Sequence, residues 1–254
     1  VVFEMRNWCV NHPQIKDKEV LHNVNINVRR GEIVGIAGLM GAGRTELMMS
    51  LMGAYGSNIR GEVCFEGKPI EIHSSGDAIR NGICYVSEDR KRYGLILEQD
   101  IKFNISLPVL ERLSNGMLID DNRLFRDVSQ YVKDLGVKTP SIEQLCKNLS
   151  GGNMQKVVLA KWLMTKPRVL IMDEPTRGID VGAKVEIYNI MNELVANGMS
   201  VIMISSELPE VLGISDRIYV MHEGSITAEL DHKDATQEVI MQYCTGVKEM
   251  PGVH

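Results

Sequence analysis

The sequence predicts an α/β fold built on a largely parallel sheet. Short apolar runs suited to buried strands alternate along the chain with segments whose apolar residues recur at helical spacing. The expected strands are "EIVGIA" (32–37), "GEVCFEG" (61–67), "GICYVS" (82–87), "RVLIMD" (168–173), "SVIMIS" (200–205) and "RIYVMHEG" (217–224). The expected helices lie at 44–52, 122–135, 152–165, 182–197 and 207–213.

Two stretches depart from this alternation. Residues 3–30 favour antiparallel strands with a polar face. The interval 95–160 is mainly helical in pattern and shows no obvious buried strand, which indicates a helical insertion. We therefore expect one domain with a β lobe and first core half at about 1–94, a helical subdomain at about 95–160, and a second core half at about 161–254.

Composition narrows the class of protein. The 254 residues are 44% hydrophobic and 24% charged, as in an ordinary globular protein. A net charge of −5 argues against a general nucleic-acid binder, although a local basic patch stays open. No apolar run is long enough to span a membrane. The five cysteines are scattered without CxxC spacing, which favours free thiols in a reducing cytoplasm.

The stretch "GIAGLMGAGRTE" (35–46) is typical of a phosphate-binding loop that leads into a helix. Its glycines let backbone N–H groups close around an anion, and the positive end of the helix dipole points to the same place. Thr45 stands where a hydroxyl would bind Mg²⁺, but Arg44 stands where the motif G-x-x-x-x-G-K-[ST] has lysine. A tight connection is the alternative. The expected nucleotide-binding residues are Gly38, Leu39, Met40, Gly41, Ala42, Gly43, Arg44, Thr45 and Glu46.

A second motif, "RVLIMDEPT", is an apolar strand that ends in Asp173 and Glu174. Carboxylates at the carboxyl end of a parallel strand face the ligand crevice. There Asp173 would hold a metal ion, and Glu174 would orient or deprotonate an attacking water. Alone, an Asp-Glu pair is often a solvated turn. Its separation from the loop by one α/β half favours a nucleotide site.

The third motif, "NLSGGNMQKVVLAKWL", opens a helix with Ser150, Gly151 and Gly152. A hydroxyl and free amides there project toward an anion together with the helix dipole. A plain helix cap is the alternative. The position about twenty residues before "MDEP" makes the motif specific.

LSGG-x-x-Q followed by "VLIMDEPTRGID" resembles the ATPase domain of ABC transporters, over essentially the whole chain. The resemblance implies a P-loop NTPase (RecA-like) core with an N-terminal antiparallel β lobe and an inserted helical subdomain. It implies ATP and Mg²⁺ as ligands, and two domains paired head-to-tail so that each LSGG covers the partner's ATP. Residues implied to lie at that seam are Ser150, Gly151, Gly152, Gln155 and Asp180. The aromatic residue that stacks on adenine is Trp8 or His12.

Three positions depart from that family's pattern. The loop lysine is Arg44, whose planar fork does not fit a cradle shaped for an ammonium group. Glu88 takes the place of a glutamine and could bind Mg²⁺. Ser206 takes the place of the switch histidine and is expected to act in catalysis with a shorter reach and no charge. We therefore expect this domain's own site to bind nucleotide and to hydrolyse it slowly or not at all.

The stretches "AGLMGAGRTE", "SEDRKRYGL", "LSGGNMQK", "DEPTRGIDVGAK" and "ISSELPE" together resemble the second ABC domain of tandem bacterial monosaccharide importers. These are of the ribose, galactoside, arabinose and xylose types, and the details lean toward xylose. The absence of an initial methionine fits a C-terminal half. The resemblance implies a peripheral protein on the cytoplasmic face of the bacterial inner membrane.

The partners that this resemblance implies are the N-terminal ABC domain, membrane permease subunits and, indirectly, a periplasmic sugar-binding protein; no nucleic-acid partner is expected. "SEDRKRYGL" would face the permease or be only a solvated face. Two alternatives stay open: a pseudo-ATPase that binds nucleotide only to pair, and a soluble ABC clamp in translation or DNA repair.

Overall fold

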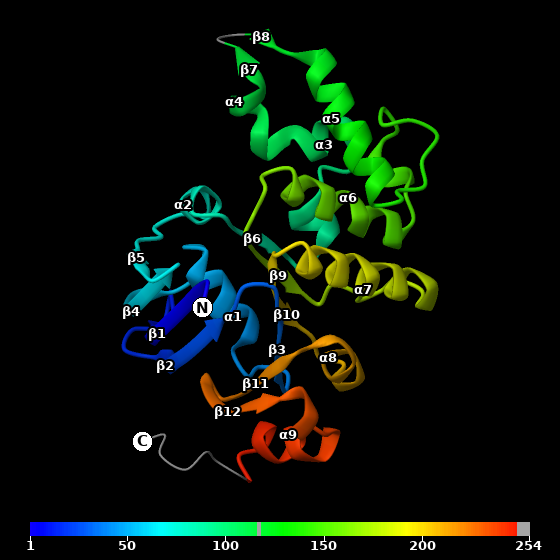
Figure 1. Ribbon diagram of the computed structural model, residues 1–254. Coiled ribbons are helices and arrows are strands. Elements are labelled where there is room, and N and C mark those ends of the chain that lie inside the picture. Colours follow the sequence, from blue (N-terminus) through cyan, green and yellow to red (C-terminus); the bar gives the residue numbers. More distant parts are fainter. Residues whose placement is uncertain (116–117, 248–254) are drawn as a thin grey trace. The chain divides into compact units, whose positions relative to one another are not determined.

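The computed structural model describes residues 1–115 and 118–247, which form two compact units (Figure 1). Unit 1 consists of Val1–Tyr85, Arg168–Glu174 and the described residues from Met191 onward. Unit 2 consists of Val86–Pro167 and Pro175–Ile190. The predicted helical interval 95–160 falls within unit 2.

The main sheet of unit 1 has the strand order β12–β11–β3–β10–β9–β6. Strands β11, β3, β10 and β9 run parallel, and β12 is antiparallel to β11. Five of the six predicted apolar runs are strands of this sheet, in which β9 and β10 are buried at every position. The sixth run, at 61–67, instead contributes to β4 (Ser57–Phe65) of an antiparallel sheet. The strands are β3 (Ile33–Gly38), β6 (Ile83–Val86), β9 (Val169–Asp173), β10 (Ser200–Ile204), β11 (Arg217–His222) and β12 (Ser225–Asp231).

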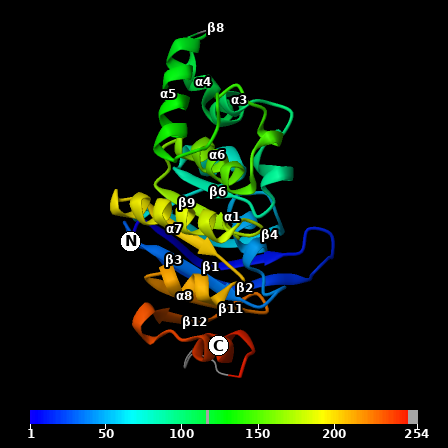
Figure 2. The ribbon, with the colours of Figure 1, turned by 90° about the vertical axis from the view of Figure 1, so that its right-hand side faces the viewer.

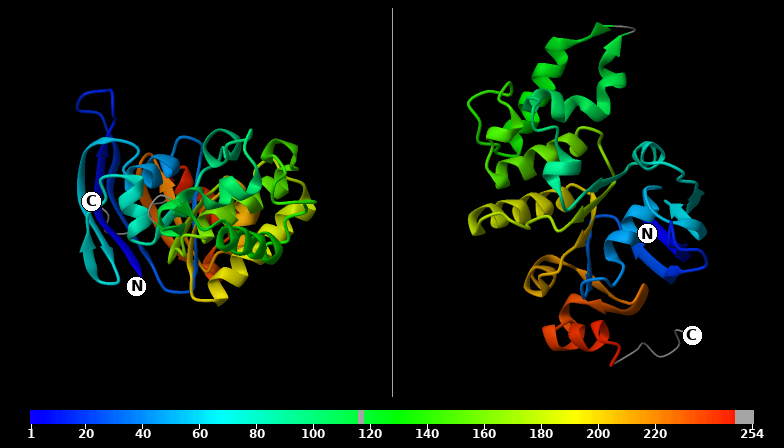
Figure 3. Two further views of the ribbon diagram at one scale, coloured as in Figure 1. Left: turned by 90° about the horizontal axis from the view of Figure 1, so that it is seen from above. Right: turned by 180° about the vertical axis from the view of Figure 1, so that it is seen from behind.

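A second, antiparallel sheet has the order β2–β1–β4–β5 and confirms the predicted β lobe. Alternation along β1 and β2 puts apolar side chains on the buried face. The loop between these two strands projects beyond them (Figure 3, left). The strands are β1 (Phe3–Asn11), β2 (Glu19–Val28), β4 (Ser57–Phe65) and β5 (Lys68–Ile70).

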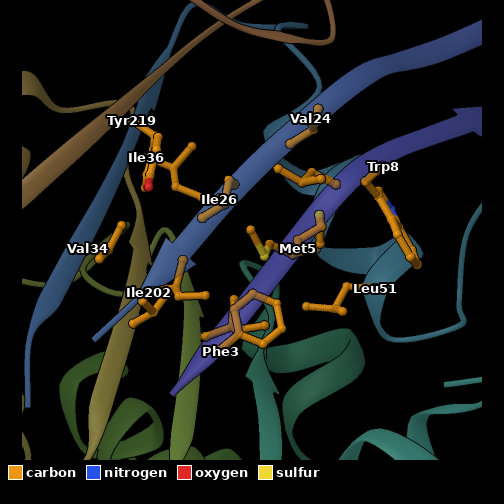
Figure 4. Close-up of a cluster of buried hydrophobic side chains, with 14 of the residues drawn as sticks. Phe3, Met5, Trp8, Val24, Ile26, Val34, Ile36, Leu51, Ile202 and Tyr219 are labelled. Carbon is orange, nitrogen blue, oxygen red and sulfur yellow. The ribbon is translucent and has the colours of Figure 1, made fainter. Parts of the chain in front are cut away.

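One hydrophobic cluster joins both sheets and helix α1 (Arg44–Leu51), as Figure 4 shows. Phe3 and Ile26 come from the antiparallel sheet, and Ile202 comes from the main sheet. Trp8 belongs to the same cluster, and its indole N–H donates to Ser50 Oγ of α1 at 3.0 Å. The cluster therefore fixes α1, and with it the loop that precedes α1, against both sheets.

Unit 1 also contains the helices α2 (Ser75–Arg80), α8 (Leu208–Ile214) and α9 (Gln237–Cys244). Helix α8 packs on β3, and α9 packs on β11 (Figure 2). Helix α7 (Val181–Ala196) begins in unit 2 and ends in unit 1. The short elements α2, β5, β12 and α9 were not predicted from the sequence.

Unit 2 is built on helices α3, α5 and α6, which pack on one another (Figure 3, right). In α5, the buried residues Leu124, Val128 and Val132 recur every four positions, so one face enters the core. The remaining elements are short, including a two-stranded pair, β7–β8, within the interval predicted to be helical. The elements are α3 (Ile101–Ser106), α4 (Leu110–Leu113), β7 (Ser114–Asn115), β8 (Leu118–Ile119), α5 (Asp121–Asp134), α6 (Gly151–Leu163) and a π-helix, η1 (Arg90–Gly94). In the part of the chain that the structure describes, no helix has the length and apolarity needed to cross a membrane.

We expect Ile202→Ala to lower the free energy of unfolding by about 2–5 kcal/mol, because the substitution leaves a cavity in a closely packed cluster. Ile202 is 0% exposed, whereas Ile15 in the β1–β2 loop is 48% exposed. Ile15→Ala is therefore the matched control and should change stability little. Chemical denaturation of both variants measures the difference, and equal losses would contradict the assignment of the core.

Candidate functional site

The phosphate-type loop spans the gap between β3 and α1. Gly41 and Gly43 have φ angles of +82° and +99°, which favour glycine. A Cβ on Gly38 would lie 2.8 Å from the carbonyl oxygen of Met221, so this position also requires glycine. No side chain caps the start of α1, which leaves first-turn N–H groups free for an anion.

Asp173 at the end of β9 is buried, at 1% exposure. Its Oδ2 accepts hydrogen bonds from Thr45 Oγ1 at 3.0 Å and from Tyr85 Oη at 2.7 Å. Burial raises the pKa of Asp173, and both hydrogen bonds oppose that rise. Burial and the charge of Asp173 raise the pKa of Tyr85, so the phenol keeps its proton and remains a donor. The predicted pair of Thr45 and Asp173 is thus in direct contact.

The other carboxylate oxygen of Asp173, Oδ1, is buried and has no hydrogen-bond partner. A buried oxygen without a partner is costly unless something outside the chain completes it. Carboxylate and hydroxyl oxygens are hard ligands that suit Mg²⁺. Asp173 and Thr45 therefore fit a magnesium ion. Among the described residues, no three His, Cys, Asp or Glu side chains cluster as a complete metal site, so phosphate oxygens or waters would supply the remaining ligands.

Glu174 follows Asp173 with a φ of +47°, a strained conformation for a residue with a side chain. Its backbone N–H donates to the carbonyl of Ile204 at 2.9 Å, and its Oε2 accepts a hydrogen bond from Ser206 Oγ at 3.1 Å. Burial raises the pKa of Glu174, while Ser206 and the charge of Arg44 oppose the rise. A carboxylate with a raised pKa is suited to accept a proton from water.

Arg44 turns toward the end of β10. Its Nη1 donates to the carbonyl oxygen of Ser205 at 2.7 Å, and its Nη2 lies 3.9 Å from Oε1 of Glu174. Both charged side chains are nearly buried, at 10% and 11% exposure. The guanidinium is thus engaged with a backbone carbonyl and the candidate base. In contrast to the nearly buried Arg44, the side chains at the tip of the loop are exposed, Met40 at 99% and Leu39 at 43%.

The third motif lies in unit 2. Ser150 caps α6, and its Oγ accepts hydrogen bonds from Asn153 N at 3.4 Å and Asn153 Nδ2 at 3.1 Å. A Cβ on Gly152 would lie 2.6 Å from Cβ of Ala183, which explains the glycine. Gln155 is 2% exposed and offers little surface to a ligand in this structure.

Two more predicted residues belong to unit 2. Asp180 Oδ1 accepts a hydrogen bond from Ala183 N at 2.9 Å at the start of α7. Glu88 forms an ion pair with Arg177. Its predicted role as a ligand of Mg²⁺ stays a prediction, because Asp173 and Thr45 belong to unit 1.

Sequence reasoning missed Tyr85 and left two aromatic residues open. Tyr85 lies on β6, and its aromatic ring in a strand gives no sign that its hydroxyl reaches Asp173. Trp8 is 7% exposed and hydrogen-bonded in the core, so it is a poor candidate for stacking on a base. His12 Nδ1 accepts hydrogen bonds from Gln14 N and Ile15 N, and its role stays a prediction.

The family model of the ABC transporter domain matches residues 21–177, a range that contains all three motifs. The chain belongs to this family. It is 57% identical to a xylose import ATP-binding protein, XylG, of Thermoanaerobacter pseudethanolicus, over 98% of this chain and 49% of that protein. It is 53% identical to an L-arabinose transport ATP-binding protein, AraG, of Geobacillus stearothermophilus, over 96% of this chain and 48% of that protein.

A third relative is a ribose import ATP-binding protein, RbsA, of Clostridium perfringens, at 54% identity over 91% of this chain and 46% of that protein. The chain thus spans about half the length of the curated relatives that it matches.

Solved structures support the same fold. An ATP-binding cassette of an ABC transporter in its ADP conformation has a TM-score of 0.75 at 25% identity, covering 96% of this chain and 94% of that chain. A second structure of the same cassette has a TM-score of 0.80 at 23% identity, covering 97% of this chain and 98% of that chain. The predicted P-loop NTPase core of the ABC type, with its antiparallel β lobe, is confirmed.

Glu174→Gln should gain stability over the parent chain as the pH rises. The pKa of Glu174 is raised in the folded chain above its ordinary value of 4.5. The free energy of unfolding therefore falls as the pH rises from 4.5 to the folded-state pKa, and it stays lower at all higher pH values. Glutamine has no such cost, so the two chains should be equally stable only below about pH 4. Unfolding free energies measured across this range check the sign. A parent chain that gains on the variant with rising pH would contradict the burial of Glu174.

Proposed function

We propose that this chain is an ATP-binding domain of an ABC importer for a monosaccharide, a xylose-like pentose or a related sugar. Three relatives at 53–57% identity are named as xylose, L-arabinose and ribose import or transport ATP-binding proteins. Since the chain matches about half of each, we propose that it pairs with a second ABC domain of the same polypeptide, as the C-terminal half. The observation that carries the ATP site is the contact of Thr45 with the buried carboxylate of Asp173.

In this proposal the loop at 38–45 holds the phosphates through its backbone N–H groups and the start of α1. Thr45 and Asp173 would hold Mg²⁺, which supplies positive charge to the β- and γ-phosphates when bound. Tyr85 keeps Asp173 in place by its hydrogen bond. Glu174 would take the proton of the attacking water.

Hydrolysis in this domain's own site is proposed to be slow. The guanidinium of Arg44 is held by the carbonyl of Ser205 and lies near Glu174, so in this conformation it favours the ionised carboxylate. Ser206 is already used as a donor to Glu174. Losing one preorganised phosphate contact costs on the order of 10²–10³ in rate. The same contacts support the second candidate, a nucleotide-binding pseudo-ATPase domain.

The residues of unit 2 are proposed to act on the partner domain. Ser150, Gly151 and Asp180 would cover ATP that is held on the partner's phosphate loop. The domain would lie at the cytoplasmic face of the bacterial inner membrane, against permease subunits that receive the sugar from a periplasmic binding protein. In that setting the domain is a peripheral subunit that converts ATP turnover into movement of the permease.

Ser150→Arg should lower the ATPase rate of the tandem protein by about 10²-fold, since a bulky cation displaces the hydroxyl from the partner's ATP. Gln130→Arg, on an exposed part of α5, adds the same charge elsewhere and should leave the rate unchanged. Steady-state ATPase assays of both variants measure this. An unchanged rate in Ser150→Arg would overturn the proposed role of unit 2.

Arg44→Lys should raise the rate of ATP hydrolysis at this domain's own site by about tenfold. The ammonium group of lysine is compact, so it can bind the phosphates instead of lying beside Glu174. The assay uses the tandem protein with the other domain's catalytic glutamate replaced. Arg30→Lys, on the surface with 69% of its side chain exposed, is the matched control. Rapid hydrolysis by the parent chain in that background would contradict the slow site.

A further inference from the structure

The segment "SEDRKRYGL" contains one arginine that differs from its charged neighbours. The Asp89 carboxylate accepts hydrogen bonds from Lys91 N at 3.1 Å and Arg92 N at 3.0 Å, and so fixes the start of the π-helix η1. Lys91, Arg92 and Tyr93 are exposed, whereas the Arg90 side chain is half-buried within unit 2. The segment is therefore not a uniform solvated face.

The guanidinium of Arg90 binds two successive backbone carbonyls. Its Nη1 donates to the carbonyl oxygen of Arg177 at 2.8 Å, and its Nη2 donates to that of Gly178 at 3.1 Å. Two terminal nitrogens in a rigid plane suit such a pair of acceptors, which a lysine could not bridge in the same way. The contact joins η1 to the segment that leads into Asp180.

The same guanidinium lies beside the first turn of α6. A Cβ on Gly151 would lie 3.0 Å from Arg90 Nη2 and 3.3 Å from the carbonyl oxygen of Gly178. Only glycine lets the guanidinium and this carbonyl approach so closely. Arg90 therefore lies where three parts of unit 2 meet: η1, the segment 177–180 and the start of α6.

The arrangement costs free energy that an exposed arginine would not incur. Arg90 Nε is buried without a hydrogen-bond partner, and burial lowers the pKa of the guanidinium. A buried donor left unpaired costs on the order of 1–3 kcal/mol. A neutral side chain could fill the space that Arg90 occupies, so packing alone does not require a charged group there. The two carbonyl contacts offer a reason for the arginine.

We propose that Arg90 is a positioning residue that holds the segment 177–180 beside the start of α6. By this contact it fixes Asp180 and Ser150 relative to each other, although it touches neither nucleotide nor water. The inference rests on the proposed function, in which Ser150 and Asp180 meet ATP on a partner domain. A hydroxyl displaced by about 1 Å from its phosphate can cost up to about 10²-fold in rate.

The test uses the full-length tandem protein. Arg90→Ala should lower kcat for ATP hydrolysis by about tenfold and leave KM for ATP within about twofold, because the phosphate loops are untouched. Arg90→Lys keeps the charge but can bind only one carbonyl, and should lose an intermediate amount. Arg92→Ala removes a neighbouring exposed charge and should behave as the parent.

Amide hydrogen exchange separates positioning from general stability. In Arg90→Ala and Arg90→Lys, exchange should rise at 177–181 and at the first turn of α6, with the rest of unit 2 unchanged. Exchange that rises throughout unit 2, or a parent-like kcat in either variant, would overturn the inference. If Ser150→Arg also leaves the rate unchanged, the proposed function itself fails. If the Arg90 variants keep the parent kcat while Ser150→Arg lowers the rate, this inference alone fails.

Discussion

The candidate site of unit 1 depends on one desolvated carboxylate. Asp173 lies at the end of a fully buried strand, and a single oxygen of it receives both the hydroxyl of Thr45 and that of Tyr85. These two bonds connect β9 with α1 on one side and with β6 on the other. The second oxygen remains without a donor. Burying an acid in this way is unfavourable for the chain alone, and it becomes favourable when a cation completes the site.

Arg44 of the phosphate loop lies close to Glu174, the carboxylate that follows Asp173 in the chain. An ammonium group in its place would be a compact, strongly hydrated charge, whereas the planar fork of Arg44 reaches the carbonyl of Ser205 and approaches Glu174. Glu174 is also held by its own N–H and by Ser206. The carboxylate that we propose as the base is thus contacted by Arg44 and Ser206 and stands on a strained backbone, which leaves it less free to move toward an attacking water.

The sequence predicted the parallel strands and long helices because their apolar patterns are strong, and it placed the three motifs correctly on a loop, a strand end and a helix start. It missed β5 and α2, which are only three and six residues long. It also missed Tyr85 and Arg90. Their partners lie 88 and 87 positions away along the chain, so no local pattern reveals the contacts. A run of charged residues such as "EDRKR" predicts a solvent-exposed segment, and only the structure shows that the side chain of Arg90 is half-buried.

Two hydroxyls among the candidate residues, those of Thr45 and Ser150, take opposite roles in their hydrogen bonds. Thr45 donates its proton to Asp173, so the lone pairs of its oxygen remain for a cation. Ser150 instead accepts from the backbone and side chain of Asn153, so its proton remains for an anion. In the proposed function, the hydroxyl of Thr45 would serve a metal ion and that of Ser150 a phosphate oxygen of the partner domain's ATP. This difference comes from the neighbours and not from the hydroxyls.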